Sequence, residues 1–474
     1  MEISGNGKGK GRGVEEENIL AIIAASGTKD TQDAHEDRIA FLEAVRSVSI
    51  LSDDRVPPSY KLCQEVFKIL RIGKSLELIM ASYQLLDELE KAFPRVHLSN
   101  VNKPQSENAI PELVVAKEAW SPFVVSMEHS GCQREADKDK GGQIDSYGFH
   151  LLIQDLINVA DETNFQQSDT KSLQNMLLFQ YLVSVLESDF GPRNNANEGT
   201  MNWNLLRESL LNMLLGSRKI NYRSLVKDCL AIMCKLYENC ATFSDDLMHL
   251  ENSVGVSDND SNTSVAIALL EVAKNTCIAM QKFFTVIMEL DTSKKKAEMN
   301  GCTRRADGVR TPIVELILDE LTYNRDILHS FLQAYAEPEW KLEVVVQYLW
   351  KYISKPSVRT RRTNVSADDT TFGGALKFFS NITIARSTTK NIGAKEIQLL
   401  LVHGFQAYLS LPSKHSDEVV SSPSEETKSC SLIEICKDII SSFKTLRETD
   451  KNMEISAFGK EVLFTAATII SVKS

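Results

Sequence analysis

The stretch "SLELIMASYQLLDELEKAF", residues 75–93, carries the pattern that decides the fold. Its apolar side chains recur at steps of three and four residues, and residues at that spacing share one face of an α-helix. The resulting stripe consists of Leu76, Ile79, Met80, Tyr83, Leu86, Leu89 and Phe93. A single stripe of this kind predicts an amphipathic helix that packs one side against the protein core.

The same periodicity recurs along the chain, in roughly fourteen segments joined by short links. Helix start signals accompany it, among them Ser59 after "PP", Thr311 before Pro312, and Pro338 at the start of "PEWKLEVV". Alternation of apolar and polar residues is nearly absent, and "PRVHLSNV" at 94–101 is the best candidate for a strand. The sequence therefore predicts an all-α protein.

Two segments are apolar over more than one stripe. In "TMNWNLLRESLLNMLLGS", residues 200–217, only a narrow polar strip interrupts the apolar surface, and the long helix expected over about 264–289 is similar. A helix buried on most sides needs neighbours on both sides, which stacked helix pairs of the armadillo or HEAT kind supply. Because no sequence repeats at a fixed period, we expect a degenerate α-solenoid, with a compact irregular bundle as the alternative.

The composition is that of a globular protein that can bury a large core. The chain has 474 residues, 43% of them hydrophobic and 25% charged, and a formal net charge of −11. The first residues contain no apolar segment typical of a secretory signal, and no run reaches the length of a membrane span. The nine cysteines lie mostly within apolar helical patterns, which predicts reduced core residues in a cytosolic or nuclear protein.

Polar stretches suggest the domain organisation. Residues 1–14 form a Gly/Lys/Arg tail that we expect to be disordered, followed by an N-terminal helical lobe at 15–97. Residues 98–145 are predicted to be a mobile linker. The main helical body then runs over 146–474, with loops at 242–262 and 412–428 rich in Ser, Asp, Glu, Lys and Pro.

The motifs of common enzymes are missing from the sequence. It has no phosphate-binding G-x-x-x-x-G-K-[ST], no H-E-x-x-H, no G-x-S-x-G and no C-x-x-C pair. Cys229, Cys234 and Cys240 are spaced by five and six residues, so they cannot share one helical face as metal ligands. We therefore expect no enzyme, no catalytic residues, no metal, no cofactor and no small-molecule substrate.

Two basic islands stand out in this acidic chain and are the candidate sites. Each could be a solvated loop, an import address, a contact for an acidic partner, or a direct nucleic-acid contact. The first island, in "DTSKKKAEMNGCTRRADGVRTP" at 291–312, follows a long helix. The second island lies in "QYLWKYISKPSVRTRRTNVSADD" at 347–369. The residues predicted to contact a partner or nucleic acid are Lys294, Lys295, Lys296, Arg304, Arg305, Arg310, Lys355, Arg359, Arg361 and Arg362.

Several long blocks resemble the plant negative regulators of systemic acquired resistance, the suppressors of the non-expressor of pathogenesis-related genes. The blocks are "ILRIGKSLELIMASYQLL" (69–86), "TMNWNLLRESLLNMLLGSRKINY" (200–222), "MELDTSKKKAEMNGCTRRADGVRTPIVELILDELTY" (288–323), "WKLEVVVQYLWKYISKPSVRTRRT" (340–363) and "FGKEVLFTA" (458–466). The resemblance runs from about residue 16 to the end of the chain. It carries no catalytic or cofactor residues.

This resemblance implies a nuclear, non-catalytic protein with an armadillo-like fold. Such proteins restrain defence-gene expression and limit homologous recombination. They also resemble a non-SMC regulatory subunit of the structural-maintenance-of-chromosomes 5–6 complex, which acts in DNA-damage repair. The expected role is a scaffold that pairs with another non-SMC subunit and docks on the chromosome-bound ATPase, with indirect contact to chromatin and none to membranes. The alternatives are a stand-alone transcriptional co-repressor and a sequence-independent DNA-binding helical protein.

Overall fold

A computed structural model gives the fold of the chain as two compact units, Met1–Ile313 and Val314–Ser474. Within 243–251 and 260–266, and at 473, it describes the backbone alone. The described residues are 16–23, 32–52, 55–99, 112–116, 119–124, 142–161, 170–251, 260–303, 310–353, 371–412, 432–450 and 453–473.

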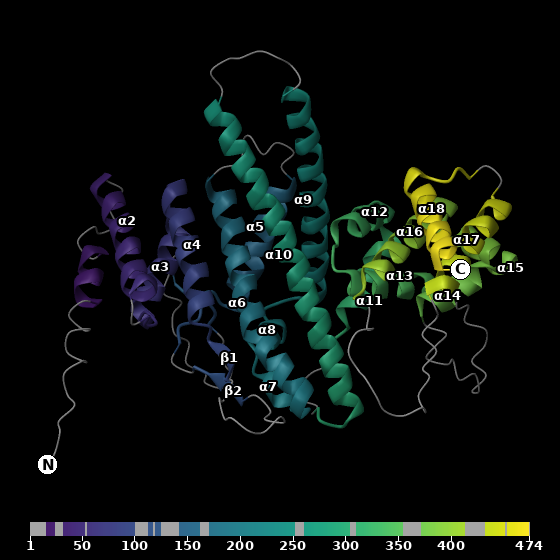
Figure 1. Cartoon of the computed structure of the whole chain (residues 1–474). Helices are drawn as coiled ribbons and strands as arrows, with labels where there is room; N and C mark the ends of the chain where they lie inside the picture. Colours follow the sequence, from purple (N-terminus) through teal and green to yellow (C-terminus); the bar gives the residue numbers. More distant parts are fainter. Residues whose placement is uncertain are drawn as a thin grey trace. The chain divides into compact units, whose positions relative to one another are not determined.

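Helices form almost all of the described part of the first unit. In chain order they are α2 (Gln32–Arg46), the π-helical η1 (Ser47–Leu51), α3 (Tyr60–Ile72), α4 (Leu76–Ala92), α5 (Ser146–Asp161), α6 (Thr170–Thr200), α7 (Trp203–Arg207), α8 (Leu210–Leu215), α9 (Tyr222–Glu251) and α10 (Asp260–Met299). Helix α4 packs on α2, α3 and α6, α6 packs on α10, and α10 packs on α9 (Figure 1). Most helices of this unit are thus covered by others on more than one side.

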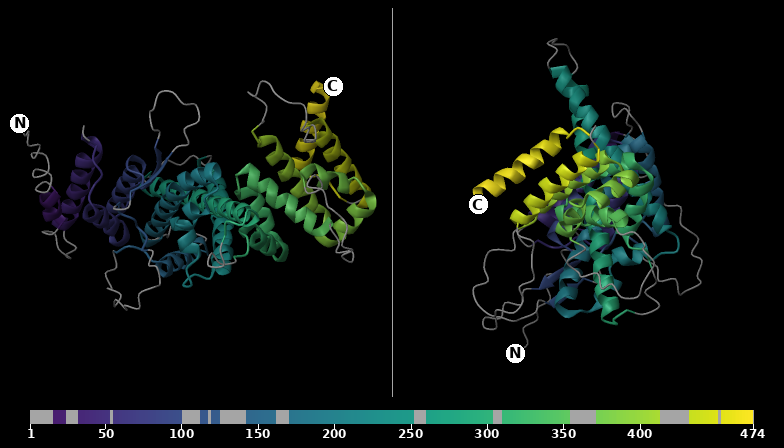
Figure 2. Two further views of the ribbon diagram at one scale, coloured as in Figure 1. Left: turned by 90° about the horizontal axis from the view of Figure 1, so that it is seen from below. Right: turned by 90° about the vertical axis from the view of Figure 1, so that its right-hand side faces the viewer.

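The second unit is helical throughout its described part. Helix α11 (Ile313–Tyr323) begins at the unit boundary. It is followed by α12 (Arg325–Ala334), α13 (Pro338–Ile353), α14 (Phe372–Phe379), α15 (Ile382–Ile392), α16 (Ala394–Ser410), α17 (Leu432–Thr449) and α18 (Ala457–Lys473). Helix α13 packs on α16, while α17 packs on α14, α15 and α18 (Figure 2).

These elements confirm the all-α prediction, and the side-by-side packing is consistent with a helical-repeat-like fold. The helix predicted over 75–93 is α4, and its start is set by Ser75, whose hydroxyl accepts a hydrogen bond from the Leu78 backbone N–H at 3.2 Å. Ile79, Leu86 and Leu89 of the predicted stripe are buried. The period therefore located the helix and half of its buried positions, since Leu78, Ser82 and Leu85 are buried as well.

Aromatic side chains fill the centre of each unit. In the first, the rings of Phe149, Phe179 and Phe283 come from α5, α6 and α10, with centroid separations of 5.8 to 6.3 Å. In the second, Phe331 stacks on Tyr335 at 5.2 Å, and Trp350 meets the ring of Phe378 edge-on at 5.0 Å. Such offset and edge-to-face pairs add to the free energy gained by burying the rings.

The strand expected at 94–101 is present. Strand β1 (Val96–Ser99) pairs antiparallel with β2 (Glu112–Val115), Val96 lying opposite Val115. Both strands contact α6. The described parts of 98–145 thus include a strand pair that packs on α6 within the first unit, while the predicted lobe boundaries stay a prediction.

The helices at the 242–262 segment are longer than predicted. Helix α9 continues to Glu251 and α10 already begins at Asp260, so helical backbone occupies both ends of the predicted loop. These ends of α9 and α10 extend beyond the neighbouring helices (Figure 1), and a helix end without neighbours needs no apolar face, so polar residues there do not by themselves predict a loop. Residues 252–259, like the tail at 1–14 and most of the loop predicted at 412–428, lie outside the described residues.

Most of the described cysteines are buried, as predicted. Cys229, Cys234, Cys240 and Cys277 are buried thiols, and burial raises the pKa of Cys240 to about 12. A thiol with such a raised pKa is a poor nucleophile and a poor metal ligand. The prediction is wrong for Cys302, which is exposed at the end of α10. Among the described helices, none has the length and apolar character that a membrane crossing requires.

Candidate partner-binding surfaces

The described part of the first basic island lies at the end of α10. Lys295 and Lys296 are exposed, and the Lys296 ammonium lies 3.7 Å from the Glu198 carboxylate of α6. Nearby, the Ser293 hydroxyl donates to the Asn194 side-chain oxygen at 2.8 Å. The last turns of α10 are thus held against α6 while their lysines face outward. Arg304, Arg305, Lys355, Arg359, Arg361 and Arg362 lie outside the described residues, and their role stays a prediction.

Arg310 has an internal role that the sequence did not indicate. Its guanidinium binds the Asp291 carboxylate at 2.5 Å and lies over the Tyr222 ring, 4.8 Å from the centroid. The other oxygen of Asp291 accepts the backbone N–H of Ile313 at 2.7 Å, capping the start of α11. Only 14% of the Arg310 side chain is exposed. Arg310 is therefore mostly buried, and one carboxylate both pairs its guanidinium and caps the next helix.

A further basic segment, which belongs to neither of the two basic islands, lies beside the first island. Gly216 ends α8, a turn follows in which Ile220 N–H donates to Ser217 O at 3.2 Å, and Asn221 then caps α9 by accepting from Ser224 N–H at 3.2 Å. Four exposed cations lie on this turn and on the first turns of α9: Arg218, Lys219, Arg223 and Lys227. Their charges are spread over ten residues with an apolar stripe between them, so they do not form a run in the sequence.

The contacts of Arg310 bring the two segments together. Tyr222 at the start of α9 and Asp291 near the end of α10 both touch the same guanidinium, and Lys294 lies about one helical turn beyond Asp291. We call this surface the basic end. It is defined by Arg218, Lys219, Arg223, Lys227, Lys294, Lys295, Lys296 and Arg310.

An apolar groove opens elsewhere on the first unit, between α4, α6 and α10. It has a volume of about 380 Å³. Helices α4 and α10 contribute residues over about two turns each, and α6 over about three turns. The lining residues are Leu76, Met80, Tyr83, Thr170, Leu173, Leu177, Gln180, Ala268, Leu269, Glu271, Val272 and Asn275. We call it the α4–α6–α10 groove.

The polar atoms at the floor of this groove are bonded to the protein itself. The Tyr83 hydroxyl donates to the Gln180 side-chain oxygen at 3.2 Å, and the Gln180 amide donates to Val272 O at 3.0 Å and to the Thr276 hydroxyl at 2.9 Å. Burial raises the pKa of Tyr83, with a further contribution from the Asp87 charge, so its hydroxyl stays protonated at neutral pH. The groove therefore offers a shaped apolar surface with its polar groups already satisfied.

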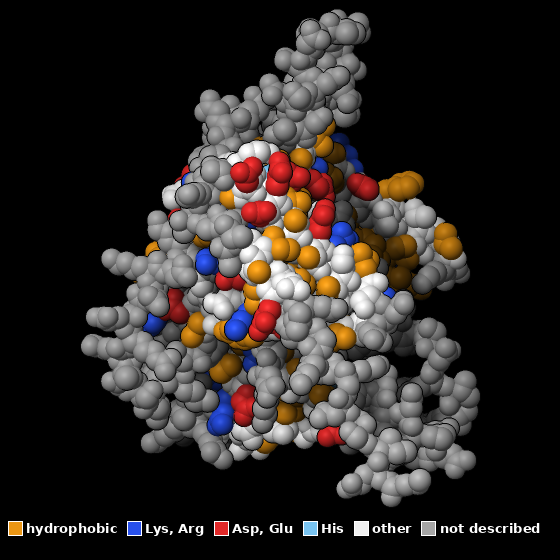
Figure 3. All heavy atoms as spheres, turned by 90° about the vertical axis from the view of Figure 1, so that its left-hand side faces the viewer, with side chains coloured by type: hydrophobic (Ala, Val, Ile, Leu, Met, Phe, Trp, Pro, Cys, Tyr) orange, Lys and Arg blue, Asp and Glu red, His pale blue; other side chains and the backbone are white. Residues whose placement is uncertain are grey.

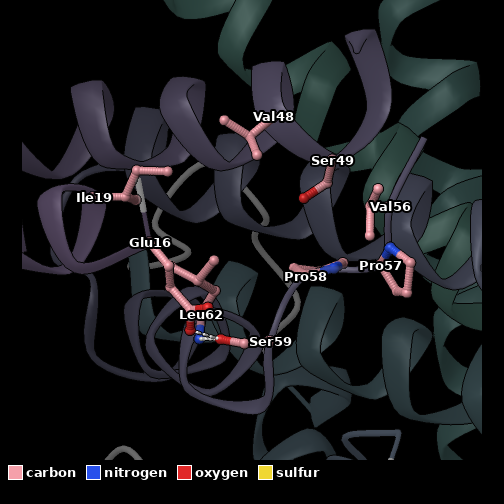
Figure 4. Close-up of a pocket in the computed structure, with 9 residues that line it drawn as sticks. All are labelled: Glu16, Ile19, Val48, Ser49, Val56, Pro57, Pro58, Ser59 and Leu62. Carbon is pink, nitrogen blue, oxygen red and sulfur yellow. Dashed lines mark hydrogen bonds between the residues drawn. The ribbon is translucent and has the colours of Figure 1, made fainter. Parts of the chain in front are cut away.

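A second cavity, at the N-terminal end of the described part, is too small for a ligand. It has a volume of about 20 Å³, room for about one water molecule, and lies between the helical residues 16–23, η1 and the start of α3 (Figure 4). Glu16 accepts a hydrogen bond from the Ser59 hydroxyl at its edge.

The face on the α2 side has a different character from the basic end. Acidic side chains gather there beside apolar ones (Figure 3), and α2 itself carries Asp33, Glu36, Asp37 and Glu43. Cations of the basic end therefore form a local exception on an acidic molecule.

The fold places the chain among all-α, helical-repeat-like proteins. Comparison with known families then identifies it further. Residues 95–337 match the model of the SNI1 middle domain and residues 353–474 match that of the SNI1 C-terminal domain. The chain is 44% identical over 461 residues to the Arabidopsis thaliana protein "Negative regulator of systemic acquired resistance SNI1", covering 97% of this chain and 95% of the relative. The chain belongs to the SNI1 family, as the resemblance predicted. No solved structure matches it.

Proposed function

We propose that this protein negatively regulates systemic acquired resistance as a nuclear, non-catalytic scaffold. Its partners are another non-SMC subunit and the ATPase of the structural-maintenance-of-chromosomes 5–6 complex. Through that complex it also acts in DNA-damage repair and homologous recombination. The regulatory part rests on the extensive identity with the Arabidopsis thaliana relative. The assembly part rests on the surfaces of the first unit.

The observation that carries the scaffold role is the α4–α6–α10 groove. Side chains from three helices wall this trough, and most of them are apolar. A partner helix can lay its apolar face into such a trough with anchors at positions i, i+3, i+4 and i+7. Leu76 is 46% exposed at its edge and Ile267 is 51% exposed nearby on α10, so a partner would bury aliphatic surface that water now covers.

The groove also favours binding over chemistry. Catalytic sites usually gather titratable groups with shifted pKa values around a cleft. Here the phenol of Tyr83 is bonded to Gln180, and the Glu271 carboxylate at the rim accepts from the Asn275 amide at 3.5 Å. Neither is positioned by a neighbouring base or metal ligand among the described residues.

Purification of the tagged full chain from plant nuclei tests this proposal. We expect stoichiometric recovery of a protein partner with the unmodified chain, and loss of that partner with the Leu76→Glu and Leu269→Glu double variant. Leu76 is the first residue of α4, where an acidic side chain suits the helix dipole, so the substitution is compatible with folding there.

An Ile278→Glu variant is the matched control. Ile278 is 49% exposed on the same helix α10 but does not line the groove. Equal partner loss in both variants, or full recovery with the groove variant, would contradict docking in the groove. Recovery of no protein partner with the unmodified chain would contradict the scaffold role itself.

A further inference from the structure

We propose that the basic end binds the phosphate backbone of duplex DNA without reading its sequence. This adds a nucleic-acid contact to the scaffold proposed above. It rests on charges from three chain segments that only the folded structure brings together: the turn before α9, the last turns of α10, and Arg310.

The local charge is positive although the chain as a whole is acidic. Eight cations define the basic end. Within its segments, 216–228 and 291–303, seven cations outnumber the three acids Asp228, Asp291 and Glu298. Acids from outside these segments also pair with its cations, among them Asp145 with Lys219 and Glu198 with Lys296. At physiological ionic strength the Debye length is about 8 Å, so a phosphate beside this surface responds to these nearby charges more than to the net −11.

The basic end contains both exposed and nearly buried ion pairs. Lys219 pairs with Asp145 at 2.9 Å and Lys296 with Glu198 at 3.7 Å, all four side chains being 41–58% exposed. Exposed pairs of this kind contribute only about 0–1 kcal/mol, so phosphate can replace the carboxylate at small cost. The Arg310–Asp291 pair, in contrast, is nearly buried and holds α9, α10 and the start of α11 in register.

The start of α9 adds to the positive potential. Helix α9 runs from Tyr222 to Glu251, and the N-terminal end of a helix carries a partial positive charge. The Asn221 side chain accepts the Ser224 N–H at this helix start. This helix end lies between Lys219 and Arg223, so the dipole and the side chains favour an anion at the same place.

The side chains around these cations fit a polymer backbone better than an acidic protein segment. Among the described large hydrophobic residues that are exposed, Met299 alone lies within the two segments. Protein interfaces usually bury aromatic and aliphatic anchors at their centre, and the basic end has almost none to offer. Its one aromatic ring at the surface, Tyr222, is covered by Arg310, so base stacking with single strands is not available.

Titration of the purified full chain with a labelled random-sequence duplex of about 30 base pairs tests the inference. We expect non-specific affinity of about 10⁻⁴ to 10⁻⁶ M near physiological salt, with log K falling as salt rises at a slope of about −3, corresponding to roughly three neutralised phosphates. The triple variant Arg223→Glu, Lys227→Glu, Lys295→Glu should lose at least about tenfold in affinity and most of that slope. Because Arg310 and Asp291 are unchanged in this variant, the packing of α9 on α10 is preserved.

The control variant carries the same change of charge in the second unit. Lys437, Lys444 and Arg447 are exposed on α17, and their replacement by Glu should reduce affinity by less than about twofold. Equal losses in the two variants would show diffuse attraction and overturn the assignment, as would absence of binding by the unmodified chain. Tighter binding of the same-length single strand would overturn the preference for duplex.

A polyglutamate peptide provides the remaining arm of the test. One outcome would show that the surface recognises acidic protein segments and that the inference is wrong. In that outcome the unmodified chain retains the peptide and the triple variant does not, while both chains bind DNA equally. The assay uses the chain alone, so its failure leaves the partner purification proposed above unaffected.

Discussion

Asp189 on α6 holds a buried network that fixes the short helices α7 and α8 to the first unit. Its carboxylate pairs with Arg193 one turn later, Nε to Oδ2 at 3.3 Å, and the side chains are only 2% and 4% exposed. The same oxygen accepts the Leu210 N–H at the start of α8, at 2.8 Å, while Arg193 donates to Leu205 O at 3.2 Å. The Asp189→Ala variant should therefore lose more than one interaction.

The size of the loss follows from what remains after the substitution. Arg193 would stay buried without its counter-charge, which typically costs about 3–5 kcal/mol. The Leu210 N–H would lose its acceptor and add to this cost, because the first N–H groups of a helix have no partner within the helix. We expect a decrease of about 4 kcal/mol in the free energy of unfolding of the first unit. The Asp189→Ala, Arg193→Met double variant should lose only about half of that, because no unpaired charge is buried.

Urea denaturation of the full chain, followed by tryptophan fluorescence, measures this loss. Trp203 is 3% exposed in α7, two residues before the carbonyl that Arg193 binds, and reports on the affected region. With a slope of roughly 3 kcal/mol/M, 4 kcal/mol moves the midpoint by about 1.3 M. The reasoning would be refuted by a loss below about 1 kcal/mol, or by a double variant less stable than Asp189→Ala alone.

Three further predictions concern individual side chains. Gly404→Ala should destabilise the second unit by about 1–3 kcal/mol, because the added methyl would lie 2.6 Å from the Phe372 ring, and calorimetry should show a lower Tm for that unit only. His403 has a pKa lowered to about 4 by burial and by the charges of Lys341 and His329, so the unfolded chain binds more protons and stability falls as pH drops from about 6.5 towards 4. At pH 5 the His403→Gln variant should avoid about 1–2 kcal/mol of that loss, a reduced figure because the ring is partly exposed. If the variant and the unmodified chain lose the same stability between pH 7 and pH 4, the prediction is contradicted. Burial raises the pKa of Glu90, so the folded chain binds its proton more tightly and stability falls as pH rises above about 4.5; Glu90→Gln should stabilise the protein at pH 7 but not at pH 4, and equal stabilisation at both values would refute the cause.

The sequence was most informative where one helix face is buried. The stripe in 75–93 predicted α4 because Ile79, Leu86 and Leu89 all face the core. The same stripe included Leu76, Met80 and Tyr83, which line the α4–α6–α10 groove instead. Periodicity marks apolar positions but cannot distinguish a core contact from an open groove, since both require the same residues on the same face.

The basic end shows a different limit of sequence reasoning. The run Lys294–Lys296 is visible as an island, whereas Arg218, Lys219, Arg223 and Lys227 are dispersed among apolar residues. Their convergence depends on the antiparallel packing of α9 on α10, which brings residue 222 beside residue 291. Arg310 was predicted as a surface contact because its neighbours are polar, but the capping requirement of α11 gave its partner Asp291 a structural role.

The central claim is that this chain restrains defence by holding a partner, and complementation of plants that lack the endogenous gene tests it most directly. The measurement is the basal transcript level of defence genes in plants expressing the unmodified chain, the Leu76→Glu, Leu269→Glu variant, or the Ile278→Glu control at equal protein levels. The unmodified chain and the control should restore low transcript levels, while the groove variant should leave them high. Full restoration by a groove variant that no longer retains its partner would contradict the account.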